Sequence, residues 1–304
     1  MDELILHHFD LSPFAEKARV MLGIKSAVWR SVQIPMIMPK PDLMPLTGGY
    51  RKTPVLQIGA DVYCDTRRIA LELERRCPEP TLFPAGRGLE MALAAWSDRA
   101  FFEPGAGLSM GVSKELPEEL LQDRKAFFNF MEFDRLTEQL PHLYGQFLCH
   151  ANLIASQLAD GRRHLLADQP GLADIHAYAP LWMARTFVPP INAHLARFEA
   201  LAAWEARMRA IGHGDRSELE AGAALEIARQ ASPAAAGGID ESDPLELVAE
   251  QRVEVTPDDY GKVPVAGELV TLSLEEIAIR RADVRFGDVI VHFPRTGYRV
   301  AAVG

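Results

Sequence analysis

A serine followed directly by a proline, Ser12-Pro13, is the first feature of the chain that could do chemistry. Serine at the N-cap and proline at the first helical position favour a helix start, because the hydroxyl accepts a free backbone N–H and proline has none to lose. A helix N-terminus also carries a partial positive charge, which stabilises an anion such as a thiolate. Ser12 is therefore either a helix cap alone, or a cap that also donates its hydroxyl hydrogen to a thiol and lowers the thiol's pKa.

Two further pairs of residues could bind a ligand. Thr53-Pro54 begins an apolar run, and proline at the start of a strand fits either an edge strand or a cis peptide. A cis Pro54 would turn the backbone N–H and C=O groups of Thr53 outward, toward an extended peptide. Asp65-Thr66 can cap a helix, or can offer a carboxylate and a hydroxyl to an ammonium group. Considered singly, each pair is explained by its structural role.

Short strands and helices alternate around these pairs. Apolar residues spaced three and four apart predict a helix after Ser12, and Gly59-Ala60 between two β-prone runs predicts a hairpin. A loop with four prolines separates the second strand from this hairpin. The predicted strands cover residues 4–8, 27–32, 54–58 and 61–64, and the predicted helices cover residues 12–23 and 65–76. The order is β-α-β, a long loop, then β-β-α.

In this order, the elements and the three pairs resemble the thioredoxin-like N-terminal domain of glutathione transferases. The stretches that carry the resemblance are LSPFAEKAR at 11–19, RKTPVL at 51–56 and ADVYCDT at 60–66. A fourth stretch, GLADIHAY at 171–178, is similar to the one that opens the central helix of the family's helical domain, although Gly171 stands where the family usually has serine or threonine. The resemblance covers about residues 1–220 and is closest to the cytosolic enzymes with an active-site serine.

The resemblance implies a glutathione site with these residues: Ser12, Lys52, Thr53, Pro54, Asp65 and Thr66. The Ser12 hydroxyl would bind the sulfur, and Thr53 would bind the cysteinyl part through its backbone, before a cis Pro54. Asp65 and Thr66 would hold the γ-glutamyl group, and Lys52 would approach the glycyl carboxylate. Asp65 stands where the family more often has glutamate, which is one methylene longer.

The middle of the chain, residues 87–230, is predicted to be helical throughout. Apolar residues from Leu89 to Ala100 recur at helical spacing, and Pro104-Gly105 is expected to interrupt that helix. An aromatic and methionine stretch would, by the resemblance, line the pocket for an electrophile, while core packing explains it equally well. Its members are Trp96, Phe101, Phe102 and Met110.

The composition and the period of the apolar residues change in the last part of the chain. Residues 231–244 are rich in alanine, glycine and proline and are interpreted as a linker. Beyond it the apolar pattern has a period of two, which predicts a small β-rich module over residues 245–304. A lone core of about 60 residues is marginal, so we expect the module to dock, either on the helical region or on a second subunit.

Composition excludes several classes of function. The net charge of −10, without a basic stripe, is unfavourable for binding nucleic acid or an anionic membrane. Three widely spaced cysteines and no Cys-X-X-Cys argue against a disulfide framework, a zinc site and a glutaredoxin-like enzyme. The histidines lack metal-ligand spacing, so no metal is expected. With neither a secretory signal nor an apolar run of about 20 residues, we expect a cytoplasmic protein.

The predicted architecture is thus an α/β thioredoxin-like domain over residues 1–84, an all-α domain over 87–230 and the β-rich module. The leading functional hypothesis is transfer of glutathione to a small hydrophobic electrophile, by a homodimer. The alternative is a non-catalytic protein that keeps the fold to bind a ligand or partner, with the module as its working part.

Overall fold

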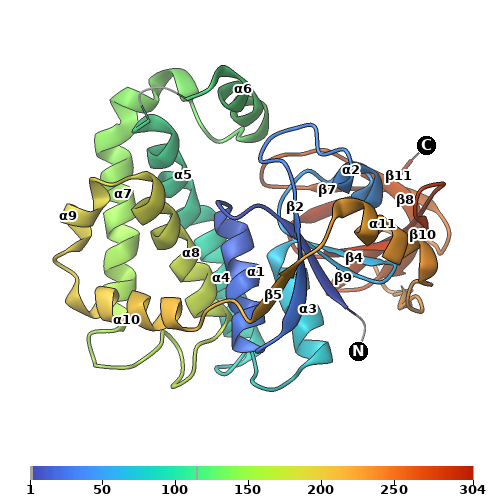
Figure 1. Ribbon diagram of the computed structural model, residues 1–304, viewed down its shortest axis with the longest axis horizontal. Helices are drawn as coiled ribbons and strands as arrows, with labels where there is room; N and C mark the ends of the chain where they lie inside the picture. Colours follow the sequence, from blue (N-terminus) through green and yellow to red (C-terminus); the bar gives the residue numbers. More distant parts are fainter. Residues whose placement is uncertain (1–2, 114–115, 304) are drawn as a thin grey trace. The chain divides into compact units, whose positions relative to one another are not determined.

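The computed structural model describes residues 3–113 and 116–303; residues 1, 2 and 304, at the ends of the predicted domains, lie outside the described part. Two compact units share the described residues. The first takes in those of Met1–Ala15, Val28–Leu71 and Asp215–Gly304, and the second takes in those of Glu16–Ala27 and Glu72–Gly214 (Figure 1). Each unit is therefore built from stretches that lie far apart in the sequence.

The N-terminal part of the chain has the predicted thioredoxin-like arrangement. Its strands lie in the order β4-β3-β1-β2, with β2 parallel and β3 antiparallel to β1. The strands are β1 (Leu4–His8), β2 (Val28–Gln33), β3 (Val55–Ile58) and β4 (Asp61–Cys64). The helices are α1 (Pro13–Ile24), the short α2 (Leu43–Thr47) and α3 (Thr66–Arg76), of which α1 from Glu16 onward and α3 from Glu72 onward are counted in the second unit. The predicted order of elements is confirmed, as is the β-rich region that follows later in the chain.

That β-rich region extends the same sheet and does not form a separate layer. It consists of β6 (Gly238–Ile239), β7 (Arg252–Pro257), β8 (Val265–Leu272), β9 (Glu276–Asp283), β10 (Gly287–Pro294) and β11 (Tyr298–Ala302). β10 lies beside β4 in parallel register, with Val291 opposite Val62, and the Ile290 N–H donates to the Ala60 carbonyl at 3.1 Å. The result is an 11-stranded sheet in which β11-β7-β8-β9-β10 continues into β4 (Figure 1).

The module therefore docks on a surface that we did not expect. It was predicted to cover its apolar face with the helical region or a second subunit, but it joins the sheet of the N-terminal domain. One core cluster contains Val62 and Cys64 from β4 together with Val289, Val291 and Phe293 from β10, all fully buried. The reason is that β4 would otherwise be an edge strand, whose unpaired backbone groups accept a further strand.

The predicted linker is also part of this unit. Between residues 231 and 244 the chain forms β6, which pairs with β8, and the Ala234 N–H donates to Asp61 Oδ2 at 2.9 Å. Asp243 is buried and forms an ion pair with Arg295 at 3.0 Å. Small residues in this segment let it pass close to the sheet: a Cβ on Gly237 would come within 2.9 Å of Thr271.

Residues 215–230, expected in the helical region, lie in the first unit. β5 (Asp215–Glu218) pairs with β2 in parallel at the other end of the sheet, and α11 (Ala221–Gln230) buries Ala224 and Ala228 in the sheet's core. β5 could not be predicted from the sequence, because its four residues are polar and mostly exposed and so carry no apolar alternation.

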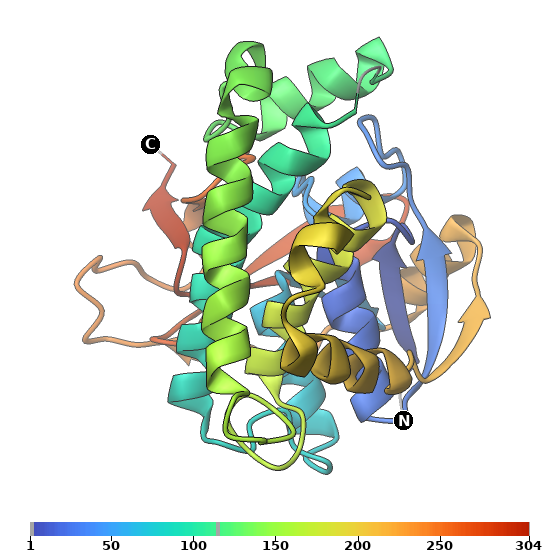
Figure 2. The same ribbon diagram turned by 90° about the vertical axis from the view of Figure 1, so that its left-hand side faces the viewer.

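The second unit is helical. Besides the parts of α1 and α3 already named, its elements are α4 (Arg87–Trp96), the π-helical turn η1 (Ser97–Phe101), α5 (Phe102–Gly111), α6 (Glu118–Phe127), the 3-10 turn η2 (Phe133–Arg135), α7 (Leu136–Gln157), α8 (Leu172–Phe187), α9 (Ile191–Leu195) and α10 (Glu199–Ala210). The long helix α7 runs beside α5 (Figure 2). Gly107 permits this close approach, because a Cβ there would lie 2.9 Å from Leu143 on α7.

The prediction that Pro104-Gly105 interrupts a helix is wrong. Both residues lie inside α5, and the irregularity comes earlier, at η1, where the Phe102 N–H reaches the Ser97 carbonyl. In a regular α-helix, proline lacks the donor for the carbonyl four residues before it and its ring clashes with that carbonyl. The carbonyl four residues before Pro104 belongs to Ala100, which lies inside the π-turn, so the local change in geometry gives the proline a place in the helix.

Gly171 at the start of α8 has a physical explanation. A Cβ at this position would lie 2.5 Å from Glu90 Oε1, so a serine or threonine cap would require the Glu90 side chain to move. Glu90 does the capping from α4, since its Oε2 accepts the Ala173 N–H at 2.7 Å. Asp174 keeps its place in the first turn, where it accepts the Gly171 N–H at 3.2 Å and the Trp204 indole N–H at 2.7 Å.

Candidate functional site

The strand registers bring the three predicted pairs to one edge of the sheet. His7 on β1 lies opposite Val55 on β3, and Val55 lies opposite Cys64 on β4. The end of β1, the start of β3 and the end of β4 therefore coincide. Ser12 follows the first of these positions, Thr53-Pro54 precedes the second, and Asp65-Thr66 follows the third. All of these residues belong to the first unit.

Ser12 is buried and caps α1. Its Oγ accepts the Ala15 N–H at 3.1 Å, and its own N–H donates to the Phe9 carbonyl at 3.1 Å. Within the described part of the chain, its hydroxyl hydrogen has no recorded acceptor. The side chain can thus cap the helix with a lone pair and still donate one hydrogen bond to a ligand atom.

Thr53 lies before a cis peptide, as predicted for Pro54. Thr53 is held in place by Lys40, a residue that was not among the predicted site residues. The buried Lys40 Nζ donates to Thr53 Oγ1 at 3.2 Å and to the Arg51 carbonyl at 2.9 Å. The only local feature of the sequence that could have indicated this role is the position of Lys40 between two prolines, Pro39 and Pro41.

The Asp65 carboxylate accepts hydrogen bonds from other groups of the protein. Its backbone has a φ of 76°, in the left-handed region that aspartate tolerates better than most residues. Its Oδ1 accepts the Arg67 N–H at 2.9 Å and Arg67 Nε at 3.1 Å, and its Oδ2 accepts Arg67 Nη2 at 3.0 Å and the Tyr298 hydroxyl at 3.1 Å. A carboxylate has about four acceptor positions, and these four donors use them. Thr66 begins α3 and is buried beside this group.

Lys52 is paired with the C-terminal module. Its Nζ donates to Asp259 Oδ1 and lies 4.3 Å from the centre of the Tyr260 ring. Burial lowers the pKa of Lys52, although the ion pair with Asp259 opposes this effect. No local pattern could have identified Asp259 or Tyr298, which are separated from their partners by 207 and 233 positions.

The hydroxyl of Tyr298 also connects to Tyr50. The two oxygens are 2.9 Å apart, and since Tyr298 donates to Asp65, Tyr50 is the donor in this second bond. Burial, together with the charge of Asp65, raises the pKa of both tyrosines well above 10. Both phenols are therefore neutral donors at physiological pH.

The two histidines at the end of β1 belong to the core. His7 Nε2 lies 2.8 Å from Gln57 Oε1, and His8 Nε2 lies 3.1 Å from Ser31 Oγ. Burial lowers the pKa of His7 to about 4, so its ring is neutral at pH 7. Adjacent strand residues face opposite sides, and both histidines are buried because both faces of the sheet are covered here.

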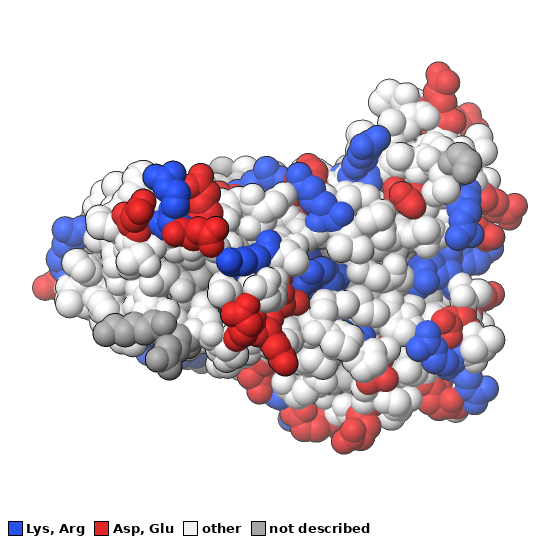
Figure 3. All heavy atoms as spheres, turned by 90° about the horizontal axis from the view of Figure 1, so that it is seen from above, with Lys and Arg blue, Asp and Glu red and all other residues white. Residues whose placement is uncertain are grey.

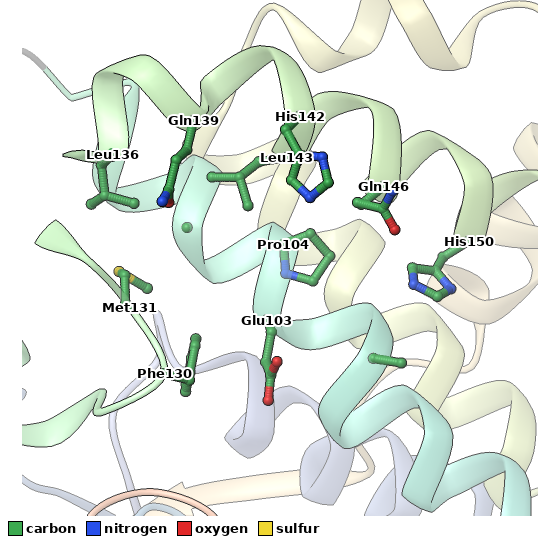
Figure 4. Close-up of a pocket in the computed structure, with 12 residues that line it drawn as sticks. Glu103, Pro104, Phe130, Met131, Leu136, Gln139, His142, Leu143, Gln146 and His150 are labelled. Atoms are coloured by element: carbon green, nitrogen blue, oxygen red, sulfur yellow. The ribbon is translucent and has the colours of Figure 1, made fainter.

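The residues predicted to line an acceptor pocket lie in the second unit. Phe101 and Phe102 are buried, Trp96 and Met110 are half-buried, and the Trp96 and Phe101 rings stack with centres 5.6 Å apart. A cavity of about 360 Å³ lies between α5 and α7. Its walls include Glu103, Phe130, Met131, His142, Gln146 and His150 (Figure 4).

None of the four predicted residues lines that cavity, but two of the residues that line it contact members of this group. His150 lies 5.5 Å from the Trp96 ring and 5.6 Å from the Phe101 ring, and Phe130 lies 6.5 Å from the Phe102 ring. Burial lowers the pKa of His150. The aromatic stretch thus packs behind the cavity, and its assignment as an acceptor pocket stays a prediction.

Among the described residues there is no cluster of histidine, cysteine or acidic side chains suited to a metal ion, and no helix with the length and apolarity to cross a membrane. On the face drawn in Figure 3, basic and acidic side chains are interspersed.

Comparison with known proteins identifies the family. The model described as glutathione S-transferase, N-terminal domain, matches residues 6–81, and the model described as glutathione S-transferase, C-terminal domain, matches residues 132–211. A comparison with curated proteins found no match.

Solved structures agree with the family models. A GST-like protein from Pseudomonas syringae is 39% identical, with a TM-score of 0.81 over 100% of both chains. FzlA from C. crescentus is 26% identical, with a TM-score of 0.52 over 68% of this chain and 88% of its own. A glutathione S-transferase from Rhodospirillum rubrum is 23% identical, with a TM-score of 0.52 over 68% of this chain and 87% of its own. The chain therefore belongs to the glutathione transferase family, with a β-rich region added at its C-terminus.

Proposed function

We propose that this protein is a glutathione transferase that joins the glutathione thiol to a small hydrophobic electrophile, with Ser12 as the catalytic residue. The observation that carries the proposal is the hydrogen bonding of the Ser12 hydroxyl. Its oxygen caps α1, while its hydroxyl hydrogen is available to a ligand at the sheet edge that also holds Thr53-Pro54 and Thr66.

The chemistry required of Ser12 is modest. A hydrogen bond to a charged group contributes about 1.5–3 kcal/mol, and a helix N-terminus adds about 0.3–1 kcal/mol. One pKa unit corresponds to about 1.4 kcal/mol, so these two effects lower the pKa of the bound thiol by roughly one to three units. The thiolate sulfur then attacks the electrophilic carbon and forms the C–S bond, while the displaced electron pair leaves with the acceptor's leaving group.

The remaining residues would hold the tripeptide. The N-terminus of α3, with Thr66, suits the γ-glutamyl carboxylate, because free N–H groups and the helix dipole favour an anion there. Asp65 would accept from the γ-glutamyl ammonium in exchange for one of its four present donors. Thr53 would bind the cysteinyl backbone.

We place the acceptor in the second unit, at the aromatic stretch of Trp96, Phe101, Phe102 and Met110. The neighbouring cavity of about 360 Å³ has the size that small ligands occupy. We further propose a cytoplasmic homodimer, the arrangement that the family resemblance implies and the commonest symmetry of soluble oligomers.

One observation favours the second candidate, a non-catalytic binding protein. Lys52 and Asp65, two of the residues assigned to glutathione, already have partners in the module, Asp259 and Tyr298. A protein of this kind would bind glutathione weakly and turn over no electrophile.

Two measurements separate the candidates. Thermal shift and calorimetry with glutathione test binding, and conjugation assays with several electrophiles test turnover. The ultraviolet absorbance of the thiolate gives the pKa of bound glutathione, which should rise by about one unit or more in Ser12→Ala, with turnover at mildly acidic pH falling roughly tenfold. An unchanged thiol pKa and unchanged turnover in Ser12→Ala would remove Ser12 from the mechanism. Binding without turnover of any electrophile would favour the second candidate.

A further inference from the structure

The C-terminal module places two of its connections at the same sheet edge as the candidate site. β10 is parallel to β4, so both strands end at this edge, and Tyr298 at the start of β11 lies opposite Pro257 at the end of β7. The loop over residues 258–264 and the turn over residues 295–297 therefore both emerge there. The Asp258 N–H donates to the Gly297 carbonyl at 3.0 Å and joins them.

The loop reaches Lys52 with a carboxylate. The Lys52 side chain is 11% exposed and that of Asp259 is 28% exposed, so most of this ion pair is shielded from water. The Tyr260 ring covers the ammonium from another side, at 4.3 Å. A shielded pair interacts more strongly than one on the surface, where the median contribution is small.

The Lys52 ammonium already has a negatively charged partner. Asp259 and Asp65 both favour its charged form electrostatically, while Arg67 opposes it. A ligand carboxylate that approaches Lys52 must therefore compete with Asp259 for the ammonium.

We propose that Asp259 is a specificity-determining residue that takes the place of the ligand's glycyl carboxylate on Lys52. The site then gains little from a free carboxylate at that end of the ligand, and it accepts γ-glutamylcysteinyl thiol peptides in which this carboxylate is masked, as in an ester or amide, about as well as glutathione. This inference rests on the proposed function, since it concerns the ligand of the same site. It differs from the expectation that Lys52 itself recognises the glycyl carboxylate.

The test compares the binding of two ligands to wild type and to three variants by titration calorimetry. The ligands are glutathione and its monoethyl ester at glycine, which differ only in the masked carboxylate. The affinities of wild type for the two ligands should lie within about fivefold of each other, because a weak electrostatic contribution changes an affinity by no more than about this factor. Asp259→Asn should bind glutathione about tenfold more tightly, with its affinity for the ester unchanged, because a charge-assisted hydrogen bond to Lys52 becomes available.

Two controls isolate the Lys52–Asp259 interaction. Asp288→Asn removes the same charge from an exposed position on β10 of the same module, and should alter neither affinity. The double variant Lys52→Gln/Asp259→Asn should lose the gain seen in Asp259→Asn, since no ammonium remains to bind the glycyl carboxylate.

The outcomes are distinct. A preference of wild type for glutathione over the ester by more than tenfold overturns this proposal and leaves the proposed function intact, as does an Asp259→Asn variant with unchanged glutathione affinity. Binding of neither ligand by wild type and every variant overturns the proposed function and this proposal with it. If Asp259→Asn is too unstable to titrate, the two wild-type affinities alone decide.

Discussion

His292 on β10 of the module binds one carboxylate of the N-terminal domain and one of the module itself. We therefore expect its replacement to destabilise the first unit. Its Nε2 lies 2.9 Å from Asp61 Oδ1 on β4, and its Nδ1 lies 2.6 Å from Glu276 Oε1 on β9. The ring also stacks on Tyr63 at 4.5 Å. Burial lowers the pKa of His292, but the hydrogen bonds to Asp61 and Glu276 outweigh it, so the pKa lies above its usual 6.5.

The change His292→Phe keeps a ring on Tyr63 and removes the charge and both hydrogen bonds. Removing one partner of a buried pair costs about 3–5 kcal/mol, because the other charge is left uncompensated. Here Asp61 keeps the Ala234 N–H and Glu276 keeps Arg68 at 3.4 Å, so we expect the lower end, about 3 kcal/mol. At about 2–4 °C per kcal/mol for a domain of this size, the melting temperature should fall by about 6–12 °C.

The effect should depend on pH with a definite sign. Because the folded-state pKa of His292 lies above that of the unfolded chain, its stabilising contribution is fully present below the unfolded value of 6.5. The contribution is lost as the pH rises through the folded pKa. The difference in unfolding free energy between wild type and variant should therefore be largest near pH 6, and smaller at alkaline pH.

Urea unfolding followed by circular dichroism at several pH values measures this difference. His142→Phe makes the same substitution at an exposed position on α7 and should change the unfolding free energy of the first unit little. If His292→Phe were as stable as wild type near pH 6, or if the difference grew as the pH rose, the reasoning would be refuted.

Four further outcomes are expected. Asp65→Ala should raise the KM for glutathione with kcat largely kept, since Asp65 would bind a group remote from the sulfur; steady-state kinetics showing a loss in kcat alone would contradict this. Gly171→Ser should destabilise the second unit by about 1–3 kcal/mol in urea unfolding, because its Cβ meets Glu90, and an equally stable variant would show that α4 can move. Light scattering at micromolar concentration should give the mass of a dimer, and a monomer mass would exclude the proposed symmetry. Truncation after Ala231 should abolish cooperative unfolding of the first unit, because it removes the core partners of Val62; an unchanged melting curve would make the module an independent appendage.

The sequence predicted the elements whose signals are local. Ser12-Pro13 marks the start of α1, the runs around Gly59-Ala60 form β3 and β4, and the Thr53–Pro54 peptide is cis. Each of these signals lies within a few residues of the structure it predicts. Pro104 was misread because the π-turn that accommodates it has no sequence signature of its own.

The missed features depend on contacts between distant residues. The polar strand β5 exists because β2 offers it an edge, and the module joins β4 for the same reason. The ion pair of Lys52 with Asp259 follows from that joining. Composition and periodicity describe residues 245–304 as β-rich, but they carry no information on which strand those residues meet.

The way in which the module joins the sheet determines what it can reach. In the thioredoxin-like order, β4 is an edge strand, and a sheet edge is stabilised when another strand covers it. β10 pairs with it in parallel, so the two strands end together, at the edge where Asp65 and Thr66 begin α3. The chain must then turn at this edge to enter β11, and the antiparallel partner β7 must end there. A module that stabilises β4 by parallel pairing therefore places its loops beside the candidate ligand site, and the contacts of Asp259 and Tyr298 follow directly from the topology.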